Sequence, residues 1–169
     1  MIRLAEKGLP GAIEGYGQVF LLNTDYRVWL RYPDILQESP ESLFIREVPV
    51  ITQEVVDALD LFYNEPAEIP RGSGSSEQLF DWETDGDYIY AAFMQAYGID
   101  LVDTELHWHK FLALFSSLPE ETHMTKIMSY RAYKGSDKEM KQLKSAWALP
   151  VKISEEEQQA MEEFNEIFG

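Results

Sequence analysis

Residues 80–133 constrain the fold of this chain more than any other stretch, because aromatic and aliphatic residues recur there at helical spacing. Two helix-ending signals divide the stretch. Gly98 favours a left-handed C-cap, and Pro119 cannot continue a helix. The pattern therefore predicts three consecutive helices that supply most of a hydrophobic core, and none of its motifs is typical of an active site.

The apolar residues of this stretch indicate how each helix packs. The helix over residues 87–97 carries a wide apolar arc, so we expect it to be largely buried. The next helix, with Thr104 as its N-cap, has the strongest amphipathic pattern in the chain and should bury Trp108 and Phe111. Acidic residues after Pro119 favour the start of the third helix.

Three side chains of the stretch are expected to face solvent. Tyr88 falls just outside the apolar arc of the first helix, and His109 and Lys110 fall on the polar side of the second. Tyr88, His109 and Lys110 are therefore the predicted partner-binding residues.

The N-terminal part should begin with a β-hairpin, because short extended segments in residues 11–22 flank Gly15-Tyr16-Gly17. Asn23 or Thr24 can cap the helix that follows, and Pro33 should kink or break it. Residues 37–50 are expected to form a connection with one short helical turn. Thr52 then precedes an amphipathic helix that would bury one apolar face: Val55, Leu59 and Phe62.

The Gly- and Ser-rich sequence RGSGSSEQ at residues 71–78 is typical of a linker, although a surface loop within one compact domain explains it equally well. The predicted division is an N-terminal part over residues 1–70, a linker or loop over 71–78, and a helical core over 79–169.

Two capping boxes predict further helices near the C-terminus, Ser136 with Glu139 and Ser154 with Glu157. Seven of the fourteen basic residues lie between Lys126 and Lys152, whereas the last helix has six glutamates and no basic residue. Internal charge complementarity or two solvated faces explain this contrast better than a site for a charged partner helix.

The formal charge of −16 disfavours binding to nucleic-acid phosphates and to anionic membranes, and leaves mimicry of DNA as a remote alternative. The chain has no cysteine, which excludes disulfides, thiolate metal sites and thiol nucleophiles. Its first residues lack the apolar run of a signal peptide, and no apolar stretch is long enough to span a bilayer. We expect a cytoplasmic protein.

Two motifs suggest metal binding only weakly. His107 and His109 are two residues apart, so on a helix they would point away from each other. The acidic sequence DWETDGD at residues 81–87 resembles part of a calcium loop but lacks the distal glutamate, so helix capping is the better explanation. With no phosphate loop or nucleophile elbow either, we predict a protein without catalysis, metal or cofactor.

Two longer motifs resemble a known family. The sequences DGDYIYAAFMQAYGIDL and LHWHKFLALFSSLPEET are similar to the bacteriophage gene-product-fifteen family, and LNTDYRVWL at residues 22–30 resembles its N-terminal hallmark. The family commonly has two adjacent aromatic residues where this chain has Trp108 and His109. Since position 109 is expected at the surface, the change should leave the core intact.

The resemblance implies a mainly α fold with a small N-terminal β-hairpin, for which the patterns above predict five to seven helices. It also implies a tail assembly chaperone that binds the tape measure protein in the host cytoplasm and self-associates. The alternatives are a structural tail or connector subunit and an acidic inhibitor of a host protein.

Overall fold

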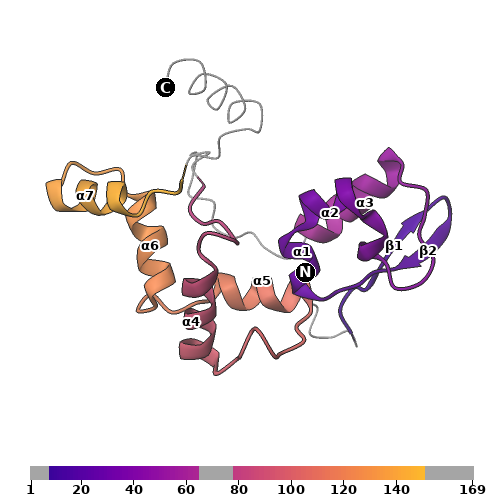
Figure 1. Ribbon diagram of the computed structural model, residues 1–169, viewed down its shortest axis with the longest axis horizontal. Coiled ribbons are helices and arrows are strands. Elements are labelled where there is room, and N and C mark those ends of the chain that lie inside the picture. Colours follow the sequence, from indigo (N-terminus) through magenta and orange to yellow (C-terminus); the bar gives the residue numbers. More distant parts are fainter. Residues whose placement is uncertain (1–7, 65–77, 151–169) are drawn as a thin grey trace, which may run out of the picture.

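The structure is a computed structural model that describes residues 8–64 and 78–150 (Figure 1). Within these residues it contains one antiparallel β-hairpin and seven α-helices, which confirms the predicted mainly α class. In chain order the elements are β1 (Ala12–Gly15), β2 (Gln18–Leu21), α1 (Tyr26–Leu30), α2 (Tyr32–Glu38), the 3-10 turn η1 (Pro40–Leu43), α3 (Gln53–Asn64), α4 (Gly86–Tyr97), α5 (Trp108–Ser116), α6 (His123–Ala132) and α7 (Lys138–Ala146).

The predicted hairpin is confirmed, with Ile13 opposite Phe20 in its register. Tyr16 and Gly17 both have positive φ, at 52° and 70°, which matches the backbone of a two-residue hairpin turn. The Tyr16 N–H donates to Glu54 Oε1 at 3.0 Å, so the turn is attached to the first turn of α3.

The helical segment after the hairpin divides into α1 and α2 at Arg31, two residues before Pro33, as the proline predicts. The expected N-cap is wrong by one or two residues. Asp25 caps α1 by accepting a hydrogen bond from the Arg27 N–H at 2.9 Å, whereas Asn23 accepts from the Asp25 N–H. The predicted helical turn is η1, and α3 buries Val55, Leu59 and Phe62 as expected.

A single hydrophobic core contains residues from both sides of residues 65–77. Its largest fully buried side chains are Trp29 of α1, Phe93 of α4, and Trp108 and Phe111 of α5. Helix α5 contributes four side chains to this core. An isolated antiparallel bridge pairs Asp25 with His107, and so joins the segment before residues 65–77 to the segment after them. The predicted linker at residues 71–78 lies outside the described residues except for Gln78, so the division there stays a prediction.

The three helices predicted over residues 80–133 are confirmed as α4, α5 and α6, and Gly98 ends α4 with φ of 66°. Helix α5 begins at Trp108 rather than after Thr104, because the His107 side chain provides the N-cap. Helix α4 is less buried than expected. Only Ile89, Ala92 and Phe93 are fully buried, and Met94 is exposed.

The C-terminal end of α6 is attached to α4 by a buried ion pair. The Arg131 guanidinium donates two hydrogen bonds to the Asp85 carboxylate, at 2.6 and 2.9 Å, and both side chains are shielded from solvent. It also donates to the backbone oxygens of Leu79 and Trp147, at 3.0 and 2.6 Å. Arg131 therefore connects four segments of the chain.

Helix α7 begins one residue later than the capping box predicted, because Asp137 rather than Ser136 accepts the hydrogen bond from the Met140 N–H. The predicted helix after Ser154 lies outside the described residues.

Replacing Arg131 with methionine should destabilise the protein by about 3–5 kcal/mol, because the Asp85 carboxylate would stay buried without its cation. Equilibrium unfolding in urea measures this. The matched control is Arg31→Met, which removes the exposed pair of Arg31 with Glu38 at 4.0 Å and should cost less than about 1 kcal/mol. Equal costs for the two variants would contradict the central role of Arg131.

Candidate protein-binding groove

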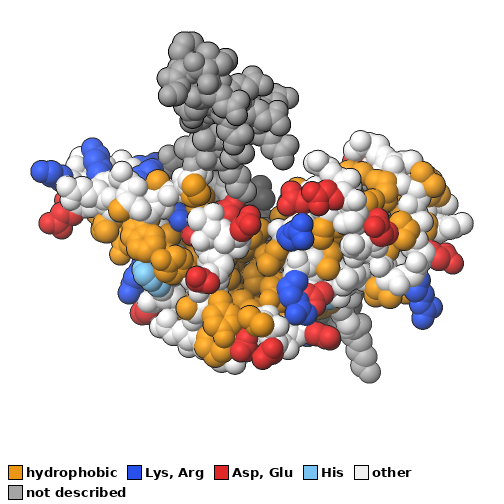
Figure 2. All heavy atoms as spheres, viewed as in Figure 1, with side chains coloured by type: hydrophobic (Ala, Val, Ile, Leu, Met, Phe, Trp, Pro, Cys, Tyr) orange, Lys and Arg blue, Asp and Glu red, His pale blue; other side chains and the backbone are white. Residues whose placement is uncertain are grey.

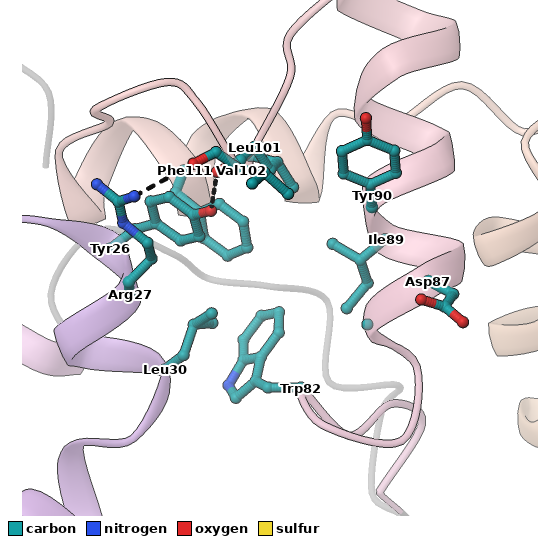
Figure 3. Close-up of a pocket in the computed structure, with 11 residues that line it drawn as sticks. Tyr26, Arg27, Leu30, Trp82, Asp87, Ile89, Tyr90, Leu101, Val102 and Phe111 are labelled. Atoms are coloured by element: carbon teal, nitrogen blue, oxygen red, sulfur yellow. Dashed lines mark hydrogen bonds between the residues drawn. The ribbon is translucent and has the colours of Figure 1, made fainter.

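An open groove of about 660 Å³ lies between α1 and α4 (Figure 3). We call it the α1–α4 groove, and its lining residues are Tyr26, Arg27, Leu30, Trp82, Gly86, Asp87, Ile89, Tyr90, Leu101, Val102 and Phe111. Figure 3 places Arg27 and Leu30 on the α1 side, opposite Ile89 and Tyr90 on α4. In Figure 2, hydrophobic side chains continue into a hollow between the two halves, with charged side chains along its edges.

The base of the groove is apolar and held in place by ring contacts. Tyr26 stacks on Phe111 with ring centroids 4.7 Å apart, and Trp82 contacts the same phenylalanine edge-on at 5.6 Å. The Tyr26 hydroxyl donates to the Leu101 carbonyl at 2.6 Å, and burial raises the pKa of this hydroxyl. These contacts fix the base without a bound partner, as is usual for a preformed binding site.

One charged network borders the groove. The Arg27 guanidinium bonds to the Asp25 carboxylate at 2.6 and 2.9 Å and donates to the Val102 carbonyl at 3.3 Å. These bonds from Arg27 are the main reason why the pKa of the Asp25 carboxyl is lowered. On the α4 side, the Tyr90 hydroxyl donates to Asp100 at 3.3 Å, and Asp87 is exposed. An apolar base with a polar border is the usual anatomy of a protein-binding surface.

The three predicted contact residues do not line this groove. Lys110 is exposed, as expected. Tyr88 is half-buried, because its ring packs edge-on against His123 and Trp147 at 5.0 and 5.5 Å.

The expected exposure of His109 is wrong, since its side chain is fully buried. Its ring lies 4.5 Å from the Phe62 ring, and its Nε2 lies 2.9 Å from the Phe62 carbonyl oxygen. The C-terminal end of α3 covers the side of α5 that the helical pattern assigned to solvent. Residue 109 is thus part of the interior. The histidine that stands here, in place of the second aromatic residue common in the family, therefore changes a buried contact and not a surface contact.

The two histidines of the HxH motif serve the backbone. His107 Nδ1 accepts the His109 N–H at 3.0 Å and so caps α5, and His107 Nε2 lies 2.9 Å from the Pro10 carbonyl oxygen. Because Nδ1 accepts, Nε2 carries the proton and donates to Pro10.

The acidic sequence before α4 also has structural partners. Asp81 accepts hydrogen bonds from the backbone N–H groups of Glu83 and Thr84, at 3.2 and 2.9 Å, and so stabilises the turn before α4. The predicted capping of the helix itself is wrong, because no acidic side chain among the described residues accepts a hydrogen bond from the first N–H groups of α4. Asp85 occupies the N-cap position of α4 but pairs with Arg131 instead. Over residues 8–64 and 78–150, no three His, Asp or Glu side chains are grouped so that they could hold a metal ion.

None of the helices in the described part of the chain has the length and apolar character needed to cross a membrane.

Sequence patterns did not identify the groove. Leu30 and Val102 lie far apart in sequence, and no periodicity within one helix relates the two segments. Leu30 ends the motif at residues 22–30, and Val102 directly follows the motif that ends at Leu101, but neither motif indicates that the two segments face each other.

The structure predicts that the pKa of His107 lies below the usual histidine value of about 6.5, chiefly because the side chain is buried. The folded state then binds fewer protons than the unfolded state, so stability from His107 is present above pH 6.5 and is lost as the pH falls below it. An NMR titration should give a lowered pKa for His107. The variant His107→Asn keeps a capping acceptor, and its free energy of unfolding should fall less between pH 7.5 and 5.5 than that of the wild type. A measured His107 pKa at or above 6.5 would contradict the predicted lowering.

Comparison with known proteins gives one family. Residues 47–149, more than half of the chain, match the family described as Bacteriophage Gp15 protein. No curated protein and no solved structure matches the chain. The matched range includes α4 and α5, which carry two of the motifs behind the resemblance, whereas the motif at residues 22–30 precedes it. This protein belongs to the bacteriophage Gp15 family.

Proposed function

We propose that the protein is a non-enzymatic tail assembly chaperone that binds the tape measure protein in the host cytoplasm. The family assignment supports the broader role, a phage structural or morphogenesis protein. The observation that carries the specific proposal is the α1–α4 groove, an apolar surface bordered by Arg27 and Asp87.

The groove suits an amphipathic helix. Helix-binding grooves take apolar anchors spaced three or four residues apart, and a helix is about 10–12 Å wide with its side chains. Leu30 on one side and Ile89 on the other would contact such anchors, while Arg27 and Asp87 would meet the polar flanks of the bound helix. A tape measure protein is a long helical chain, so it offers such faces repeatedly and would bind many chaperone copies.

The charge of the chain supports the same proposal. A net charge of −16 on 169 residues disfavours association of one complex with another. A partner with apolar faces would therefore stay soluble when acidic chaperones cover those faces. Self-association of the chaperone along the partner is part of this proposal.

Co-expression with the tape measure protein of the same phage should make that protein soluble, and the two should co-purify. Soluble yield and size-exclusion chromatography with mass measurement give the result. If the tape measure protein stays insoluble and no complex forms, the chaperone proposal is wrong.

The groove itself is tested by Val102→Asp, which should weaken the complex at least tenfold, or about 1.4 kcal/mol, by placing a carboxylate against the apolar partner. Val19→Asp on β2 is the matched control, because both valines are 69% exposed and both changes add one negative charge. Equal binding by both variants would place the contact outside the groove.

Mass spectrometry of purified virions distinguishes the chaperone from a structural tail subunit, the alternative that the family assignment also allows. A chaperone leaves before the particle is complete, so the protein should be absent. Its presence in stoichiometric amount would favour the structural subunit.

A further inference from the structure

A second open cleft lies beside the hairpin, which Figure 1 places at the opposite end of the molecule from α7. The segment at residues 45–50 is attached to the hairpin twice. The Ile45 N–H donates to the Leu21 carbonyl at 3.0 Å, and the Tyr16 hydroxyl donates to the Val50 carbonyl at 2.9 Å. Between β2 and this segment a space of about 460 Å³ stays open, which we call the hairpin cleft.

The lining of the hairpin cleft is mostly apolar and carries a negative charge. Phe20 is buried, whereas Val48 and Val50 are exposed, Val50 by 76%. Glu47 also lines the cleft, and Glu54 accepts a backbone N–H of the adjacent hairpin turn at 3.0 Å. None of the described residues that line the cleft is basic. Such a surface suits a lysine side chain, which has an apolar stem and a cationic end.

Helix α7 exposes lysines of this kind. Lys138 and Lys141 lie on its outer face, opposite the half-buried Met140 and Leu143. The surrounding charge is also distinct, because residues 123–150 contain six basic and two acidic residues, whereas residues 8–64 contain three basic and nine acidic residues. The two parts of the chain therefore carry net charges of opposite sign.

We propose that the outer face of α7 in one copy docks on the hairpin cleft of a second copy. Lys138 and Lys141 would lay their apolar stems against Val50, and their ammonium groups would then lie near Glu47. A second copy is favoured as the occupant because its α7 carries the charge that this cleft lacks. The proposal rests on the proposed function for its purpose, since a row of copies suits one long partner.

The position of the two surfaces favours such a row. The hairpin cleft and α7 are different surfaces at opposite ends of the molecule (Figure 1). A contact between them leaves one cleft and one α7 free in each pair of copies, so that further copies can add.

Sedimentation equilibrium of the protein alone tests the contact. The measured mass of the wild type should rise with concentration beyond that of two chains, up to about 1 mM protein. The salt concentration should be about 0.15 M, where repulsion between the acidic copies is screened beyond about 8 Å.

Two variants that each block one surface give the decisive comparison. Val50→Lys places a cation in the hairpin cleft, and Lys138→Glu with Lys141→Glu reverses the charge of α7. Each variant alone should keep the mass of one chain. An equal mixture should form a complex of two chains, because the first variant supplies an intact α7 and the second an intact cleft. This complex would also show that both variants are folded.

Matched control variants carry the same charge changes elsewhere. Val19→Lys changes a valine that is 69% exposed on the opposite face of β2 from Phe20. Arg31→Glu with Lys110→Glu reverses two exposed charges outside α7. Both controls should assemble as the wild type does.

Four outcomes would overturn the proposal. A wild-type mass that stays at one chain would exclude self-association, and one that stops at two chains would exclude the row. Assembly of either blocked variant by itself would indicate contact between two identical surfaces. A mixture that stays at one chain would show that the two surfaces do not bind each other. Binding of the tape measure protein is not measured here, so failure of the chaperone proposal would be recognised separately.

Discussion

The buried pair of Arg131 with Asp85 is the interaction on which the arrangement of the C-terminal helices depends. Taking two charges out of water is costly, and the pair repays this only because each partner is hydrogen-bonded on several sides. Asp85 also accepts the Asp81 N–H at 2.9 Å, so the turn before α4 belongs to the same network. A shift of α6 against α4 would break several bonds at once, and this penalty specifies one geometry.

That geometry also determines the α1–α4 groove. Asp85 immediately precedes α4, and Gly86, Asp87, Ile89 and Tyr90 at the start of this helix line the groove. The opposite side is set by Asp25, which caps α1 and pairs with Arg27. Phe111 of α5 lies between the two sides and stacks on Tyr26 and Phe93. The two sides of the groove are thus α1 and the first turn of α4, and both sides contact the same aromatic base. These contacts hold the two sides in place although no described residue covers the space between them.

The sequence predicted those features that local signals determine. The end of α4 at Gly98, the hairpin turn at Tyr16-Gly17 and the break near Pro33 each depend on the backbone preference of one or two residues. Helix α5 ends at Ser116, shortly before Pro119. Burial of His109 and pairing of Asp85 with Arg131 depend on where another helix lies, and no periodicity within one helix contains that information. For the same reason no pattern within one helix indicated the groove, whose sides come from segments about 70 residues apart. The predicted contact residues lie outside it, and their role in binding stays a prediction.

The groove and the α7 surface differ in the chemistry that each would recognise. The groove has an apolar base and balanced charges at its border, so shape and apolar contact would dominate binding there. The surface of α7 has a half-buried apolar stripe, Met140 and Leu143, and the exposed lysines Lys138 and Lys141, so charge would contribute more to binding there and salt would weaken it. Lysines left uncovered on α7 would attract the acidic surface of a neighbouring copy. The net charge of −16 opposes that attraction over the rest of the surface, which is the condition under which many copies can lie along one partner without aggregating.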